Sequence, residues 1–157
     1  MLIPLLAALH VAVVVLWIGG VGFVTIIIFP LIGRMSSSFE AVMLFQGVEH
    51  RFARHARIYV ALTGITGFLL LYATRLQYLL FTFKGLGITL MFVAWLFYLL
   101  VLIFEKRIFK KLFGAREGKE FEAKKVFAIL GVFHWFVLGL SMLAVFVGVW
   151  WAHAGGI

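Results

Sequence analysis

The chain of 157 residues contains no cysteine and no aspartate. Without cysteine it can form neither a disulfide framework nor a thiolate metal site, and it cannot attach a c-type haem covalently. Its six acidic residues are all glutamates that lie outside the long apolar runs. The sequence also lacks a Ser/His/Asp set, a Cys/His set, paired carboxylates and a phosphate-binding loop. These absences disfavour hydrolytic chemistry and proton pumping on acidic residues.

Charge is scarce throughout: 13% of the residues are charged and 65% are hydrophobic. A mean hydropathy of +1.16 is far above that of soluble domains. Four apolar runs are long enough to cross about 30 Å of hydrocarbon as helices, at residues 2–28, 56–72, 79–104 and 126–151. The first run has no preceding Lys or Arg and is too long for a signal peptide. The sequence predicts an all-α fold, an integral membrane four-helix bundle that forms one transmembrane domain over residues 1–157.

The basic residues are distributed very unevenly between the predicted loops. Twelve of the fourteen Lys and Arg residues lie in the first and third loops, and only Arg75 and Lys84 lie on the other side. The positive-inside rule therefore predicts both termini outside and both basic loops in the cytoplasm. The net charge of +8 is explained by this topology, with anionic membrane lipid as partner and no nucleic acid. We expect a multi-pass protein of the cell (inner or plasma) membrane.

Local signals predict where the spans end. Span one is expected to end near residues 29–30, and Ser38 is expected to cap a helix that runs on into span two. A short outer turn is predicted around residues 75–77. The third loop, residues 105–125, reads as a helical extension of span three, a break at residues 114–118 and a lead-in to span four.

The histidine His10 lies about a third of the way into the first apolar run. An ionisable group at membrane depth is rare and costly, so it marks a functional site by default and faces a bundle interior. Counted from the predicted span ends, His10 and His134 each lie roughly 12 Å from opposite membrane edges. In a core about 30 Å thick these depths are similar, so the two imidazoles could share one iron if spans one and four are neighbours.

Each span carries one polar stripe at helical spacing. His10 aligns with Trp17 in span one. In span four, the small residues Ser141 and Gly148 follow His134 along one face and are expected to leave a slot for a flat ligand. The other two stripes consist of His55, Tyr59 and Thr66 in span two, with Gly64 and Gly67 on the far side, and of Lys84, Met91, Trp95 and Tyr98 in span three.

Bundle cores often hold cofactors between facing helices, and imidazole is the usual proximal ligand of haem iron. We therefore expect haem b, with His10 and His134 as the favoured axial ligands. The stripes that contain these histidines, with Trp17, Ser141 and Gly148, are expected to form walls of the site. A second haem, and other pairings such as His55 with His134, remain open. His153 is a further metal-ligand candidate, at the outer surface, whereas His50 reads as a solvated loop residue.

Three stretches resemble a known group of small membrane proteins. LHVAVVVLWIGGVGF with the following Pro30 resembles the first span of CopD-like copper-resistance proteins and of HemJ-type protoporphyrinogen oxidases. EHRFARHARIYVALTGITGFLLLY resembles the second span of both, and FTFKGLGITLMF the start of the third. For the HemJ type, the resemblance implies a four-helix protein that binds b-type haem, with His10 and Lys84 matching the essential histidine and lysine of the family.

Three functions follow from these features. The first is a haem b protein that transfers electrons within the membrane, with quinone as a small-molecule partner. The second is protoporphyrinogen oxidation, in which Lys84 orients the porphyrin and acts as the catalytic residue. The third is copper handling by Met91, Met142 and the histidines, for which five methionines without a Met-rich cluster are a thin signal. The oligomeric state stays open, a homo-oligomer included.

Overall fold

The computed structural model describes residues 1–114 and 123–153. Its four long, apolar helical segments confirm the predicted all-α four-helix membrane bundle. The elements in chain order are α1 (Leu2–Phe23), η1 (Val24–Ile28), α2 (Phe29–Gly33), α3 (Ser38–Ala73), η2 (Gln77–Leu79), α4 (Leu86–Gly114) and α5 (Ala123–His153).

The first span continues past the predicted end at residues 29–30. α1 passes through the wider π turn η1 into α2, so that one helical rod reaches Gly33. Pro30 has no N–H to donate to the carbonyl four residues earlier, and its ring crowds that carbonyl. The wider turn just before it accommodates this conflict without ending the helix. The predicted end of span one at residues 29–30 was wrong, because a local change of helix type lets the helix continue past the proline.

The second span and its lead-in form one helix of 36 residues, as predicted. The helix begins one residue earlier than expected, because the N-cap is Ser37. The Oγ of Ser37 accepts a hydrogen bond of 3.3 Å from the backbone N–H of Glu40. At 1.5 Å per residue, a helix of this length is about 54 Å long and exceeds the hydrocarbon thickness by a wide margin.

The connection between α3 and α4 is longer than the short turn that the sequence suggested. Backbone φ is positive at Arg75 (58°) and at Phe81 (62°), and η2 lies between them. The backbone N–H of Phe81 donates to the Oγ1 of Thr89 over 2.9 Å, which ties this loop to the first turns of α4. The third span therefore begins at Leu86 and not at residue 79. Its helical extension reaches Gly114 as predicted, whereas the predicted break continues into residues outside the described ranges.

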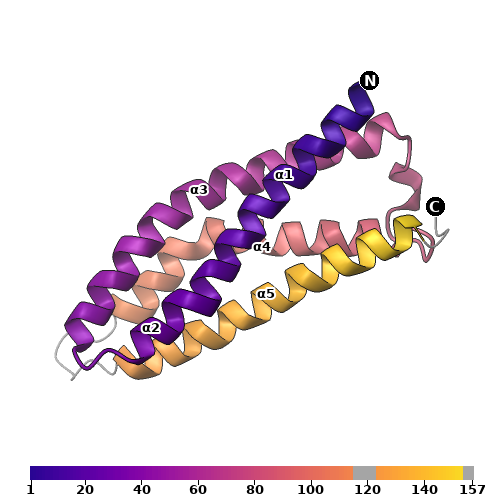
Figure 1. Cartoon of the computed structure of the whole chain (residues 1–157). Helices are drawn as coiled ribbons and strands as arrows, with labels where there is room; N and C mark the ends of the chain where they lie inside the picture. Colours follow the sequence, from indigo (N-terminus) through magenta and orange to yellow (C-terminus); the bar gives the residue numbers. More distant parts are fainter. Residues whose placement is uncertain (115–122, 154–157) are drawn as a thin grey trace.

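The four long helices run alternately up and down, with both ends of the chain on the same side (Figure 1). α1 packs mainly against α3, and α4 packs mainly against α5. We call the side with Leu2, Ala73, Leu86 and His153 the terminal end, and the opposite side the basic end. Figure 1 shows the two helix pairs close together at the basic end and farther apart toward the terminal end.

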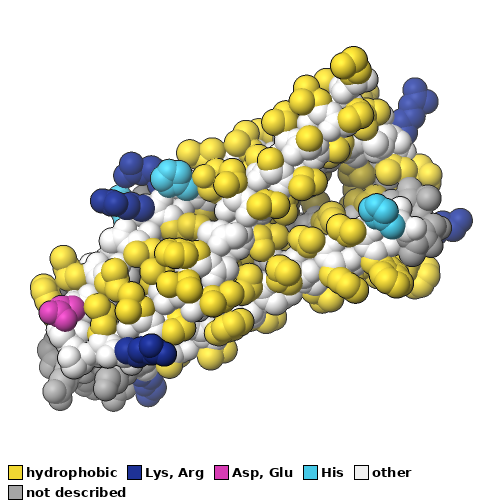
Figure 2. Space-filling model, viewed as in Figure 1, with side chains coloured by type: hydrophobic (Ala, Val, Ile, Leu, Met, Phe, Trp, Pro, Cys, Tyr) yellow, Lys and Arg dark blue, Asp and Glu magenta, His cyan; other side chains and the backbone are white. Residues whose placement is uncertain are grey.

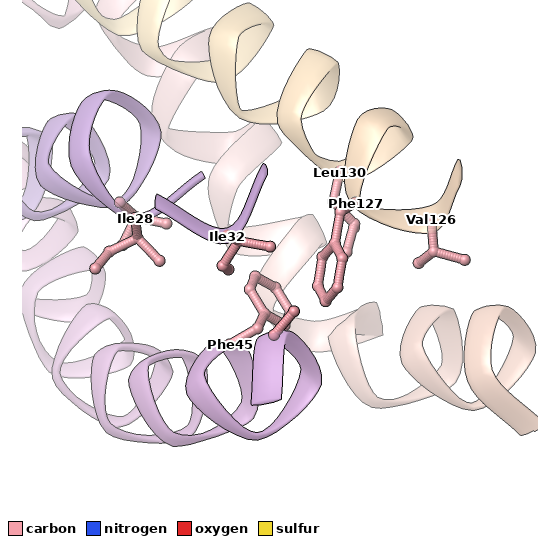
Figure 3. Close-up of a cluster of buried hydrophobic side chains, with 8 residues drawn as sticks. Ile28, Ile32, Phe45, Val126, Phe127 and Leu130 are labelled. Atoms are coloured by element: carbon pink, nitrogen blue, oxygen red, sulfur yellow. The ribbon is translucent and has the colours of Figure 1, made fainter. Parts of the chain in front are cut away.

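The packed core lies in the basic half and in the middle of the bundle. At the basic end, Phe45 of α3 packs against Ile28, Ile32, Phe127 and Leu130 (Figure 3). A second cluster, in the middle of the bundle, contains Trp17, Val21, Val60, Tyr98, Val137 and Leu138. The two helix pairs are thus joined at the basic end and in the middle of the bundle, and the terminal end has no comparable buried cluster among the described residues.

The outer surface of the bundle is mostly apolar, and Figure 2 shows the charged side chains at the terminal end and over the basic half of the molecule. Large side chains such as Val15, Ile65 and Phe146 are more than half exposed on the long helices. An apolar surface of this extent suits lipid and not water. The chain is therefore a multi-pass membrane protein.

Gly64 generates a first prediction, because α3 and α4 approach each other closely there. A Cβ at Gly64 would lie 2.6 to 2.9 Å from the indole of Trp95, which is itself fixed by a 2.8 Å hydrogen bond from its Nε1–H to the Val60 carbonyl. Gly64→Ala should lower the free energy of unfolding in detergent by about 1–3 kcal/mol. The matched control is Gly139→Ala, where a Cβ meets nothing within 4 Å. Equal thermal stability of the two variants would contradict this packing.

Candidate functional site

A large cavity lies between the helices in the terminal half of the bundle. Its volume is about 620 Å³, within the range of small-molecule and cofactor pockets. All four long helices contribute to its wall, including His10, Val14, Trp17, Thr63, Gly64, Gly67, Met91, Trp95, Ser141, Met142 and Val145. Figure 2 shows an opening on this side of the molecule, between the first and last long helices. The cavity is thus accessible from the region that lipid occupies.

His10 is the one imidazole on the cavity wall among the described residues. Its Nδ1 lies 2.9 Å from the Oγ1 of Thr66 on the neighbouring helix α3. Gly67 makes room for the ring, because a Cβ at that position would lie 3.2 Å from the His10 Cε1. The close packing of α1 on α3 therefore fixes both the position and the orientation of this side chain.

The hydrogen-bond network of Thr66 assigns the tautomer of His10. The Thr66 hydroxyl has one proton, and it donates to the Leu62 carbonyl over 2.7 Å. Its oxygen can then only accept from His10, so Nδ1 carries the proton and Nε2 keeps its lone pair. The ring also contacts the backbone of Thr63, and Nε2 takes no part in the hydrogen bond to Thr66. Metal-bound histidines commonly donate their other ring N–H in this way, which orients the ring for the metal.

Two further polar groups on the cavity wall lack partners. Trp17 and Thr63 are only 4% and 5% exposed, yet neither the Trp17 Nε1 nor the Thr63 Oγ1 has a hydrogen-bond partner among the described residues. Nearby polar groups are satisfied: the Ser141 hydroxyl donates to the Val137 carbonyl over 2.8 Å and lies 2.9 Å from the Tyr98 hydroxyl. The cavity wall thus carries one oriented imidazole, while the Trp17 Nε1 and the Thr63 Oγ1 are covered by protein atoms and are not open to the cavity.

His134 lies far from His10. The ring of His134 packs against Phe29, with ring centroids 4.8 Å apart, and its Nδ1–H donates to the Leu130 carbonyl over 2.9 Å. Phe29 lies 19 residues after His10, which is about 28 Å along a helical rod that rises about 1.5 Å per residue. The expectation that the two imidazoles meet at one depth is therefore wrong, because an iron atom binds ligands about 2 Å away.

Three further sequence-predicted residues, His55, Tyr59 and His153, also lie outside the cavity. His55 is exposed and its Nδ1–H donates to the Arg51 carbonyl over 2.8 Å, while Tyr59 packs against the middle cluster. His55 precedes Thr66 by 11 residues, or about 16 Å along α3. His153 is exposed and borders a separate shallow groove on the lipid-facing side of α5. The structure therefore brings neither histidine to His10.

Lys84 is exposed in the loop before α4 and does not line the cavity. The slot that we expected beside His134 is also closed at its far end. The position at which Gly148 would carry a Cβ is already occupied by the Met91 side chain, whereas a Cβ at Gly131 would make ordinary van der Waals contact with the Phe29 ring, at 3.6 Å. These small residues serve close helix packing, and only Ser141 of this stripe borders the cavity together with Val145.

The sequence predicted only part of the α3 wall. Thr66 was expected on the polar stripe with Thr63 close by, and Thr66 bonds to His10 while Thr63 lines the cavity. Gly64 and Gly67 were expected on the far side of span two, but both line the cavity. The predicted stripe also contained His55 and Tyr59, which lie at a different depth from His10. A useful signal was present in the sequence, since Thr63 and Gly67 are four residues apart, the spacing of small residues at close helix contacts in membranes.

Comparisons with protein-family models, with curated proteins and with solved structures give no match for this chain. The CopD-like and HemJ-type resemblance thus stays an expectation drawn from the sequence.

The tautomer assignment generates a second prediction. Because Thr66 holds the Nδ1 proton, ¹⁵N NMR of histidine-labelled protein should show His10 with a protonated Nδ1 and an unprotonated Nε2. Thr66→Val removes the acceptor, and the His10 ring should then populate the other tautomer or lose its single orientation. Thr74→Val is the matched control, because the Thr74 hydroxyl donates to the Leu70 carbonyl and not to a histidine. An unchanged His10 spectrum in Thr66→Val would refute the assignment.

Proposed function

We propose that this chain is a haem b protein of the cell membrane that transfers electrons within the bilayer, with His10 as the axial ligand. The observation that carries the proposal is the position of His10 on the cavity wall, where its Nδ1 lies 2.9 Å from the Thr66 Oγ1 and its Nε2 is left outside that hydrogen bond. A haem bound there supplies one-electron redox chemistry, tuned by its axial ligands and surroundings.

The charge distribution around the cavity supports the same proposal. No Lys, Arg or Glu lines the cavity among the described residues. Arg75 is exposed between Thr74 and Leu76, which both border the cavity at its terminal end. An apolar interior suits the porphyrin ring, while an arginine at the rim suits its propionates. Lys84 follows in the same connection between α3 and α4 and adds a second cation on this side.

The residues that would hold a haem differ from those that the sequence suggested. His134 and His55 are too far away, whereas Met91 and Met142 line the same cavity as His10. His10 together with one of these methionines would hold the iron, and histidine with methionine is an established ligand pair that raises the reduction potential. This set departs from ligation by two histidines.

Copper binding is a second candidate, and the same three side chains favour it. One imidazole and two thioethers at one cavity are soft ligands of the kind that Cu(I) selects. Protoporphyrinogen oxidation is less well supported, because it needs Lys84 at the bound tetrapyrrole and Lys84 does not border the cavity.

Haem content provides the test. The purified protein should show a Soret band that shifts on reduction, and His10→Ala should lower the haem-to-protein ratio at least about tenfold, because no other imidazole borders the cavity. His134→Ala should keep the haem content of the wild type, since its ring packs against Phe29. Exposed His153 gives the matched control, His153→Ala.

Three outcomes decide between the candidates. A His10→Ala variant with full haem content would remove His10 as ligand and contradict the proposal. Loss of haem in His134→Ala alone would move the site to the basic half. A colourless wild-type protein that contains stoichiometric copper by elemental analysis, and loses it on His10→Ala, would replace haem by copper.

A further inference from the structure

A cluster of basic side chains lies on one face of α3, away from the cavity. We call this cluster the α3 basic patch, and its members, all of them exposed, are His50, Arg51, Arg54, His55 and Arg57. Residues three and four apart share a helix face, so the patch covers about two turns of α3. Figure 2 shows basic and histidine side chains together over α3, away from both of its ends.

The patch lies about halfway along the bundle and not at its basic end. Residues 50–57 fall in the middle of α3. Phe52, in the same turns, packs against α1 at Gly20, where a Cβ would collide with the Phe52 ring. Gly20 is itself near the middle of the helical rod that α1, η1 and α2 form. The patch is therefore level with the middle of the first span.

The surface of the first span stays apolar beyond this level. Closer to the basic end, Phe23, Ile26 and Ile27 are each more than half exposed. A guanidinium at a level where the neighbouring surface suits lipid is costly unless an anion pairs with it, because it loses hydration there. The position of the patch therefore favours an anion that belongs to the membrane.

Hydrogen bonds within the patch hold two of its side chains in place. The Arg54 Nη2–H donates to the Nε2 of His50 over 3.3 Å, and the His55 Nδ1–H donates to the Arg51 carbonyl over 2.8 Å. A guanidinium has five N–H donors in a planar fork that matches the geometry of a phosphate. The bond to His50 uses one of these donors, so it orients the Arg54 fork and leaves further donors for a phosphate.

The same face of α3 continues toward the terminal end with side chains that suit acyl chains. Ile58, Leu62 and Ile65 follow Arg54 at helical spacing and are 52%, 40% and 56% exposed. Ile65 follows Arg54 by 11 residues, or about 16 Å along the helix. This length is about half of a hydrocarbon core of about 30 Å, which is the thickness of one leaflet. A lipid with its phosphate at the patch would thus lay its acyl chains along this face.

We propose that the α3 basic patch binds the phosphate of an anionic phospholipid in the leaflet nearer the basic end. Arg51 and Arg54 donate charge-assisted hydrogen bonds to this phosphate, and the acyl chains lie along Ile58 and Leu62. The cationic charge favours an anionic lipid over a neutral one, and the adjacent apolar face favours a lipid over a soluble phosphate. The inference does not depend on a haem, because the patch shares no residue with the cavity.

Lipid retention provides the test, measured by native mass spectrometry of the purified full-length protein. Phosphatidylglycerol and phosphatidylcholine with the same acyl chains are added in turn, and the wild type should retain phosphatidylglycerol preferentially. Arg51→Gln/Arg54→Gln should weaken phosphatidylglycerol binding about tenfold or more, because it removes charge-assisted hydrogen bonds to the phosphate. Its binding of phosphatidylcholine should stay that of the wild type.

A matched control separates the patch from the overall charge of the protein. Arg34→Gln/Arg107→Gln removes the same charge from exposed positions outside α3, and it should keep the preference for phosphatidylglycerol. Excess inorganic phosphate should not displace the lipid, since it has no acyl chains to contact α3. Thermal stability of both double variants, measured in the same detergent, checks that each is folded.

The outcomes distinguish this inference from the proposed function. Equal retention of the two lipids by the wild type, or an undiminished preference in Arg51→Gln/Arg54→Gln, would overturn the inference. An equal loss in both double variants would show a general effect of charge and would overturn it as well. Displacement of the lipid by inorganic phosphate would assign the patch to a soluble anion instead. None of these results alters the haem content expected of His10→Ala.

Discussion

A polar group in hydrocarbon cannot form a hydrogen bond to water, so it must find its partner elsewhere. This constraint organises the bundle. Several hydroxyl groups of the long helices meet it locally, as Thr25 and Ser141 do by bonding to carbonyls of their own helix, and the Trp95 indole bonds to a carbonyl across the α3–α4 contact. Among the described residues, the buried Nε1 atoms of Trp17 and Trp151 and the Oγ1 of Thr63 remain without a partner. Because Trp151 does not line the cavity, an unpaired donor does not by itself mark a ligand site.

The distribution of packing explains why the cavity exists at all. Phe45, Phe127 and the aliphatic residues around them fill the basic end, and the cluster around Trp17 and Tyr98 fills the middle. Toward the terminal end the close contacts lie within helix pairs, as between Gly67 and His10 on α1 and α3. Small residues at these contacts bring two helices together without filling the space between the pairs. The close contacts that stabilise each pair thus leave the volume between the pairs open.

Hydropathy and charge were sufficient to predict the helices, but the contacts between the helices could not be predicted from the sequence. Four spans, and the continuous lead-in of α3, follow from apolar length and from the serine cap at the helix start, to within one residue at Ser37. The depth of His134 did not follow, because it was counted from an assumed membrane edge. α5 actually packs its first turns against Phe45 and the α2 segment, which places His134 beside Phe29. Depth in a bundle is set by side-chain contacts between neighbouring helices, and periodicity within one helix carries no information about them.

The number of imidazoles at the cavity changes the chemistry that a haem could perform there. Two histidine ligands would favour electron transfer. With His10 as the one histidine on the wall among the described residues, Met91 and Met142 would be the further side chains able to hold the metal, and the surrounding wall would control access to it. The Thr66 oxygen fixes the Nδ1 proton, so it also determines how strongly Nε2 can donate to a metal. A single hydrogen bond between α1 and α3 thereby links the packing of one helix pair to the redox properties of the proposed centre.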